Sequence, residues 1–253
     1  MTVNSYNSLC DDFYLDMFVN TQMDLPTERD TVLAFFERIQ KQFPSMCCFY
    51  RRENNEYSLE EDHDLGQYRW VTLEPDRIGS GVVNPSNFEM VYGQDRLVLE
   101  LVPYMLSVSP LDIDSLDVTF AMDFDCSGSH DEVIAEALFG STAFNCLLDL
   151  PSARPIAFSP AVVVALSEDC RTQGRISVES KTSIYEPWRK EQGGEEAISL
   201  SFTVRQYRPT NEKFDVLKSF EYQCQLAQQL MADKIVPSFV QPLIETIAQK
   251  RLT

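Results

Sequence analysis

The feature that most constrains this chain is a strict alternation of apolar and polar residues over residues 13–23 (FYLDMFVNTQM). Phe13, Leu15, Met17 and Val19 all fall on one face of this segment. Side chains of a β-strand point alternately to its two faces, so the pattern predicts a half-buried strand. Such a strand needs a sheet with one covered face, which the rest of the chain must supply.

The same alternation returns 101 positions later, where 116–125 (LDVTFAMDFD) aligns with 15–24 (LDMFVNTQMD). Three positions are identical and three apolar positions recur in phase: Leu15 and Leu116, Asp16 and Asp117, Asp24 and Asp125, then Met17 and Val118, Val19 and Phe120, Met23 and Phe124. The recurrence predicts a second strand of the same kind and indicates an ancient duplication. The alternative is a coincidence between two unrelated α+β halves.

A helix start follows each of these strands. Thr27 with Asp30, and Ser129 with Glu132, have the spacing of a capping box. The helices are predicted over 27–44 and 129–151, and each ends at a proline. The strands predicted after them are 47–60, 67–83, 155–167, 174–186 and 197–208. Closing helices are predicted over 87–106 and about 213–251, with kinks at Pro103 and Pro237.

Together these elements predict an α+β fold built from two pseudo-repeated β-α-β-β-(β)-α units, residues 1–110 and 111–253, packed as one compact unit. The second unit is expected to carry an extra strand and the long kinked C-terminal helix. Strands joined by short turns are antiparallel, so we expect curved antiparallel sheets covered by helices. This order of elements resembles the TATA-binding-protein and helix-grip folds, a resemblance of fold that implies no function.

Composition bears on function mainly through charge, since 39 acidic and 21 basic residues give a net charge of −18. Affinity for nucleic acids and anionic membranes depends on lysine and arginine, so neither is expected as a partner. No apolar run approaches the roughly 20 residues that span a bilayer. The N-terminus lacks the basic and apolar regions of a signal peptide. We therefore expect a cytoplasmic protein whose seven cysteines are mostly buried and reduced.

Residues 118–132 (VTFAMDFDCSGSHDE) hold the densest group of reactive side chains, which includes Asp123, Asp125, Cys126 and His130. The two aspartates could supply oxygen ligands to a metal, and Cys126 with His130 could form a nucleophile and its base. A structural interpretation is favoured for both pairs, because the aspartates fall on the solvated face and His130 follows a helix cap. The four residues remain candidates for a polar site, and no catalytic, metal-binding or cofactor-binding residue is predicted.

Aromatic residues give a second set of candidates. Tyr185, Trp188 and Arg189 lie where an insertion interrupts the repeat, and these residue types dominate protein interfaces. The alternative is that Trp188 folds back to cover the sheet edge. Trp70 lies within a predicted strand and is expected in the core. The glycines of 79–81 (GSG) lack the spacing of a phosphate-binding loop and are interpreted as a bend.

The leading hypothesis is a non-enzymatic cytoplasmic binding or interaction protein without a cofactor, because the sequence is strongly acidic and shows no catalytic constellation. In one version, it engages a basic protein surface by electrostatic steering and a few aromatic anchors. The alternative is a small-molecule binder or a carboxylate-dependent enzyme, with a pocket between the sheet and the closing helices. A third option is a structural subunit, which requires an exposed apolar face.

Overall fold

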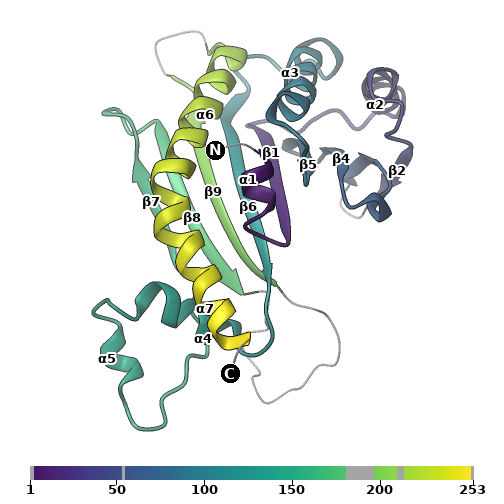
Figure 1. Ribbon diagram of the computed structural model, residues 1–253. Coiled ribbons are helices and arrows are strands. Elements are labelled where there is room, and N and C mark those ends of the chain that lie inside the picture. Colours follow the sequence, from purple (N-terminus) through teal and green to yellow (C-terminus); the bar gives the residue numbers. More distant parts are fainter. Residues whose placement is uncertain (1–2, 53–54, 181–196, 210–213, 252–253) are drawn as a thin grey trace.

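The computed structural model describes residues 3–52, 55–180, 197–209 and 214–251. Within these ranges, nine strands form one antiparallel sheet in the order β2-β3-β4-β5-β1-β6-β9-β8-β7 (Figure 1). The strands are β1 (Asp12–Thr21), β2 (Cys48–Arg51), β3 (Tyr57–Glu60), β4 (Tyr68–Leu73), β5 (Arg77–Val83), β6 (Ile113–Asp125), β7 (Ala161–Ala165), β8 (Thr172–Ser180) and β9 (Ala197–Tyr207). The expected α+β class is confirmed, and a single sheet runs through both halves of the chain.

The helices vary widely in length. They are α1 (Val3–Asn7), α2 (Arg29–Gln42), α3 (Phe88–Met105), α4 (His130–Ile134), α5 (Asn145–Leu148), α6 (Val216–Leu230) and α7 (Gln241–Arg251), with a 3-10 turn η2 (His63–Leu65) and π-helical stretches η3 (Ala135–Phe139) and η4 (Met231–Val240). The segments α6, η4 and α7 follow one another as the expected long C-terminal helix (Figure 1). Pro237 lies inside the π-helical stretch. No helix in the described part of the chain combines the length and hydropathy that crossing a bilayer requires.

The two strands predicted from the alternation, β1 and β6, pair with each other at the centre of the sheet. Met17 lies directly opposite Val118. The apolar residues of both strands face the helices and are buried, as predicted: Phe13, Leu15, Met17, Val19, Val118, Phe120, Met122 and Phe124. Helix α3 packs against β5, and α6 packs against β6 and β9 on the same side. This covered side of the sheet holds the core.

Several element boundaries differ from the prediction for local reasons. Residues 67–83 form two strands rather than one, because the chain turns at Pro75, which has no N–H to donate to a ladder. Residues 47–60 likewise form the hairpin of β2 and β3. The glycines of 79–81 belong to the regular strand β5 and not to a bend. The strand expected over 155–167 is limited to Ala161–Ala165.

The two predicted helix starts have different outcomes. Ser129 caps α4 as predicted, and its Oγ accepts a hydrogen bond of 3.3 Å from the Glu132 backbone N–H. Thr27 does not cap α2, which starts at Arg29 after the uncapped Glu28. The helix expected over 129–151 ends near Gly140, where a turn begins and the Thr142 hydroxyl donates to the Phe139 carbonyl. Glycine weakens a helix interior, which accounts for this early end.

Two further expectations are corrected. The three strands expected after residue 151 are present as β7, β8 and β9, but the second half does not have one strand more than the first, because 47–60 and 67–83 each form two strands and give the first half five. Most cysteines are not buried: only Cys224 is, while Cys47, Cys146 and Cys170 are exposed. All seven are free thiols.

Among the described strands, β7 forms one edge of the sheet and pairs with β8 alone. All five of its residues are exposed, and Val162, Val163 and Val164 each leave half or more of their surface open to solvent. Residues 155–167 around it carry no charged side chain. This segment is therefore the most apolar edge of an otherwise highly charged molecule.

A buried glutamine ties each long helix to the sheet. Gln223 on α6 donates from Nε2 to the carbonyls of Leu116 (2.7 Å) and Val204 (2.8 Å). Gln94 on α3 donates to the carbonyls of Trp70 and Gly81, each at 3.1 Å. Both amides are fully buried. Each buried amide thereby finds acceptors on the strands that its helix covers.

We predict that Gln223→Leu lowers the free energy of unfolding by about 2–4 kcal/mol, because two buried carbonyls lose their donor. Urea denaturation followed by circular dichroism measures this change. The matched control is Gln225→Leu on the exposed side of the same helix, where we expect a change within about 0.5 kcal/mol. Equal losses in the two variants would contradict the assigned role of the Gln223 amide.

Candidate functional site

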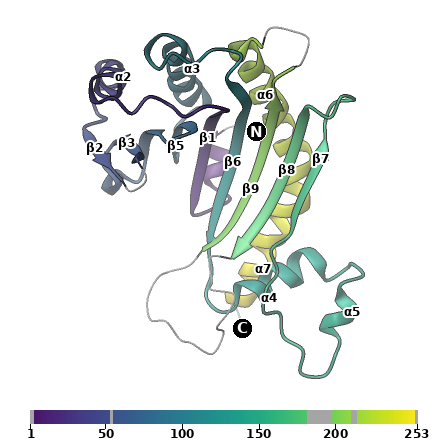
Figure 2. The ribbon, with the colours of Figure 1, turned by 180° about the vertical axis from the view of Figure 1, so that it is seen from behind.

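The side of the sheet opposite the long helices carries most of the polar side chains of the central strands. Figure 2 shows this side of β6, β9 and β8 without a helix over it. In β1 it presents Tyr14, Asp16, Phe18 and Asn20, all partly exposed. We call this side the open face. It is the candidate functional surface because polar and aromatic groups gather on it without being covered.

Hydroxyl groups line the part of the open face that β6, β8 and β9 form. Thr119 and Thr203 hydrogen-bond across β6 and β9 at 2.8 Å. Ser177 and Ser201 do the same across β8 and β9 at 2.8 Å. These pairs hold neighbouring strands together on the polar side, much as apolar contacts do on the other.

Asp117 on the open face forms a complete ion pair. The Arg205 guanidinium donates from Nε at 2.7 Å and from Nη2 at 2.6 Å to its two carboxylate oxygens. Asn20 adds a bond of 3.3 Å from its Nδ2. The guanidinium also lies 5.8 Å from the centre of the Tyr207 ring. A bidentate pair supported by an aromatic ring is a strong arrangement for a carboxylate.

Asp16, the residue that the 101-position offset aligns with Asp117, has no such partner. Its Oδ1 is buried and has no hydrogen bond within the described residues. Its direct neighbour on β5 is Gly81, which offers no side chain, and its neighbour on β6 is Thr119, whose hydroxyl bonds to Thr203. Burial raises the pKa of the Asp16 carboxyl to about 8. The chain thus holds a carboxyl in a place where its charged form is poorly stabilised.

Trp70 fills the space over the glycine. A Cβ added to Gly81 would lie 2.3 Å from Asp16 Oδ1 and 2.6 Å from Trp70 Cζ2, so the carboxyl and the indole meet above this residue. Trp70 also contacts the Phe18 ring, with centroids 5.8 Å apart. Thr72, on the same strand as Trp70, has a buried hydroxyl without a partner in the described structure. The expectation that Trp70 belongs to the core is wrong: it lies on the open face and is partly exposed.

Asp123 also lies on the open face, but it is only 8% exposed rather than solvated as predicted. Its carboxylate accepts hydrogen bonds from the Tyr14 hydroxyl at 3.1 Å and from the Ser199 hydroxyl. Burial and the neighbouring Asp123 charge raise the pKa of Tyr14. Asp125 lies at the exposed end of β6, where its N–H donates to Asp11 Oδ2.

Cys126 and His130 lie close together, with the imidazole in contact with the backbone of Cys126. The His130 Nε2 lies 3.1 Å from the backbone carbonyl of Cys126, and the ring is 6% exposed. Burial raises the pKa of the Cys126 thiol, which disfavours the thiolate that a nucleophile needs. The imidazole therefore closes the turn before α4.

The remaining predicted candidates, Tyr185, Trp188 and Arg189, lie outside the described residues. Within the described ranges, no three histidine, cysteine, aspartate or glutamate side chains are grouped so that they could hold a metal ion.

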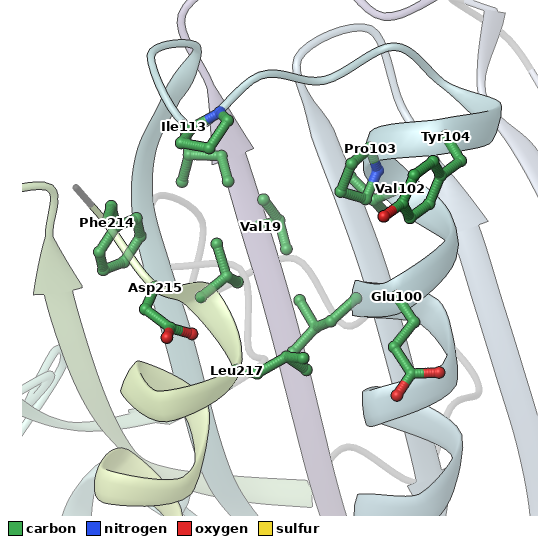
Figure 3. A pocket seen from close by; sticks show the side chains of 12 residues that line it. Val19, Glu100, Val102, Pro103, Tyr104, Ile113, Phe214, Asp215 and Leu217 are labelled. Carbon is green, nitrogen blue, oxygen red and sulfur yellow. The ribbon is translucent and has the colours of Figure 1, made fainter.

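A cleft of about 390 Å³ lies on the other side of the sheet, between the C-terminal part of α3 and the start of α6 (Figure 3). Val19 and Ile113 form its floor on the two central strands. Leu99 and Leu217 contribute to its walls. Glu100 and Asp215 add two carboxylates to an otherwise largely apolar lining (Figure 3). The cleft is large enough for a small organic molecule.

Comparison with known proteins gives little. No family model matches the chain. No curated protein matches it either. Among solved structures, it is similar to the di-domain ARO/CYC protein BexL from the BE-7585A biosynthetic pathway, at 10% sequence identity over 93% of this chain and 98% of that one, with a TM-score of 0.23. At that TM-score the likeness supports no argument about fold or function.

We predict that Asp16→Asn stabilises the protein increasingly as pH rises. The folded carboxyl holds its proton up to about pH 8, whereas the unfolded one ionises near pH 4. The folded state therefore binds more protons between these values, and the stability of the native protein falls as pH increases through them. The asparagine variant lacks this loss, so its advantage should reach a few kcal/mol, at about 1.4 kcal/mol per pKa unit.

Urea unfolding at about pH 5 and about pH 9 measures the difference between the variant and the native protein. Asp95, whose pKa burial also raises, is present in both proteins. The matched control is Asp117→Asn, which breaks the pair with Arg205 and should destabilise at both values. An Asp16→Asn advantage that does not change with pH would contradict the assigned protonation.

Proposed function

We propose that this protein is a non-enzymatic binding protein that uses the open face of its sheet to engage a positively charged surface of a partner protein. The observation that carries the proposal is the uncompensated carboxyl of Asp16 beside the partly exposed Trp70. An aromatic ring next to an acid without a counter-ion is a recognition pair for a cation. The net charge of −18 adds long-range attraction for such a partner.

The surroundings of Asp16 support the same conclusion. Asp117 already binds a cation on this face, which shows that a guanidinium can be accommodated there. Asp12 and Glu179 are further acids on strands of the open face, and Glu179 is exposed. The raised pKa of Cys126 and the contact of His130 with a backbone carbonyl favour binding over nucleophilic catalysis.

Affinity enrichment with the immobilised chain tests this proposal. We expect a basic partner to be retained at about 50 mM salt and released at about 500 mM, because screening weakens exposed charge pairs. Glu179→Lys on the open face should reduce retention severalfold, whereas Glu37→Lys, exposed on α2, should leave it within about twofold. Retention that is insensitive to salt, or equally affected by both variants, would rule out the open face as the binding surface.

A second candidate function, supported by the cleft between α3 and α6, is the binding of a small, mostly apolar molecule that carries a positive group. The apolar walls would hold its body, and Glu100 and Asp215 would attract its charge. Asp215 also caps α6 through the Lys218 N–H, so its carboxylate is held in place.

Filling the cleft tests this candidate. Leu217→Trp would occupy the space at the start of α6, while Tyr222→Trp places the same residue on an exposed part of that helix. With a panel of hydrophobic amines in a thermal-shift assay, binders should stabilise the native chain and the Tyr222→Trp control by several degrees, and the Leu217→Trp variant by about 1 °C or less. Equal stabilisation of all three proteins would exclude the cleft.

We also propose that the two halves descend from one duplicated unit. Support comes from the sheet itself: the offset of 101 aligns Met17 with Val118, and these two residues lie directly opposite each other where β1 pairs with β6. A twofold axis between them would relate the two halves. Relatives of this chain should show the same alignment between the segments that correspond to 15–24 and 116–125, and its absence among them would argue against a duplication.

A further inference from the structure

We propose that Asp16 and Trp70 form a specific docking site for one guanidinium group, the side chain of an arginine on the partner. The inference rests on the proposed function and names the chemistry of the contact. Its basis is a comparison of two aligned carboxylates within the same molecule, of which one already holds a guanidinium and the other does not.

The comparison starts from the register of the sheet. Asp117 on β6 lies directly across from Arg205 on β9, and Asp16 on β1 lies directly across from Gly81 on β5. The two aspartates occupy aligned positions of the two central strands. The chain therefore supplies its own cation to one carboxylate, while glycine stands at the corresponding place beside the other.

The aromatic partner is present at both places. Arg205 lies 5.8 Å from the Tyr207 ring centre. Beside Asp16, the Trp70 ring lies over Gly81, supported from one side by Phe18. Without its arginine, the Asp117 site would likewise consist of a carboxyl beside an aromatic ring. The Asp16 Oδ1 has no hydrogen-bond donor within the described residues.

Unsatisfied acceptors support the same assignment. Asp16 Oδ1 and Thr72 Oγ1 are both buried without hydrogen-bond partners within the described residues, and both lie next to glycines that Trp70 covers. A guanidinium has five N–H donors in a rigid planar fork, so it can serve more than one acceptor and stack on the indole at once. A lysine ammonium lacks that planar geometry, which is why we assign arginine.

Docking should release a proton, because the neutral Asp16 carboxyl must ionise to pair with the cation. Burial sets its pKa at about 8. Tyr68 on β4 and Asp95 on α3 interact electrostatically with it. Asp117 on β6 is paired with Arg205. The ionised fraction of the Asp16 carboxyl rises from about 1% at pH 6 to about 50% at pH 8, so affinity should rise on the order of fiftyfold between these values.

The test uses the full chain and a tri-arginine peptide with both ends blocked, compared with the blocked tri-lysine peptide. Two-dimensional NMR follows the indole N–H of Trp70, identified by its loss in Trp70→Phe. We expect the arginine peptide to shift this signal and to bind at least about tenfold more tightly than the lysine peptide. Binding that leaves the indole signal unmoved, or that is equal for both peptides, would overturn the proposal.

The matched variants are Asp16→Asn and Glu37→Gln, which each replace one carboxyl by its amide; Glu37 is exposed on α2, outside the open face. A specific site predicts a loss of about tenfold or more in Asp16→Asn and less than about twofold in Glu37→Gln. Equal losses would reduce the effect to general electrostatics and overturn the site. Urea unfolding confirms that both variants fold.

The failures of the two proposals are distinguishable. If a basic partner is enriched in a salt-sensitive way and lost in Glu179→Lys, while Asp16→Asn binds the arginine peptide normally, the open face stands as the binding surface and the Asp16 site falls. If the peptide docks at Trp70 but no partner is retained, the arginine site stands and the proposed partner surface falls.

Discussion

The pairing of β1 with β6 is the contact on which the rest of the structure depends. Each of these strands carries one half of the sheet on its outer side, so the nine described strands are continuous only because these two meet. Their buried faces place Met17 and Val118 side by side under α3 and α6. The same pairing fixes the positions of Asp16 and Asp117 on the opposite side. The register of this strand pair therefore determines both which side chains form the core and which lie on the candidate surface.

Much of this centre could be predicted from sequence because burial on one side imposes a period of two. That rule located β1, β6 and their buried residues correctly. The outer elements were harder. Pro75 divides one predicted strand into a hairpin, and Gly140 ends a predicted helix early. The hydrophobic pattern continues across both positions and does not mark them. In each case a single proline or glycine, with its own backbone requirements, ends the element.

The candidate site was only partly predictable, because it depends on which residues become neighbours across the sheet. The offset identified Asp16 as the counterpart of Asp117. However, Asp117 is ion-paired because Arg205 lies opposite it, and Asp16 has Gly81 opposite it instead; both neighbours are far away in sequence. Trp70 was assigned to the core because it is hydrophobic, but hydrophobicity does not determine which face of the sheet a side chain takes. Its ring lies on the open face, over Gly81 on the neighbouring strand. Asp123, found by its sequence context, is buried by hydrogen bonds that cross three strands.

The uncharged edge strand β7 has a consequence for the behaviour of the protein in solution. An exposed apolar edge is a template for pairing with another chain, and natural proteins usually protect it with local charges. Here residues 155–167 contain none, so protection falls to the mutual repulsion of molecules that each carry a charge of −18. Electrostatic repulsion between molecules weakens as salt is added. We expect colloidal stability to decline with ionic strength, and β7 to be where molecules first adhere.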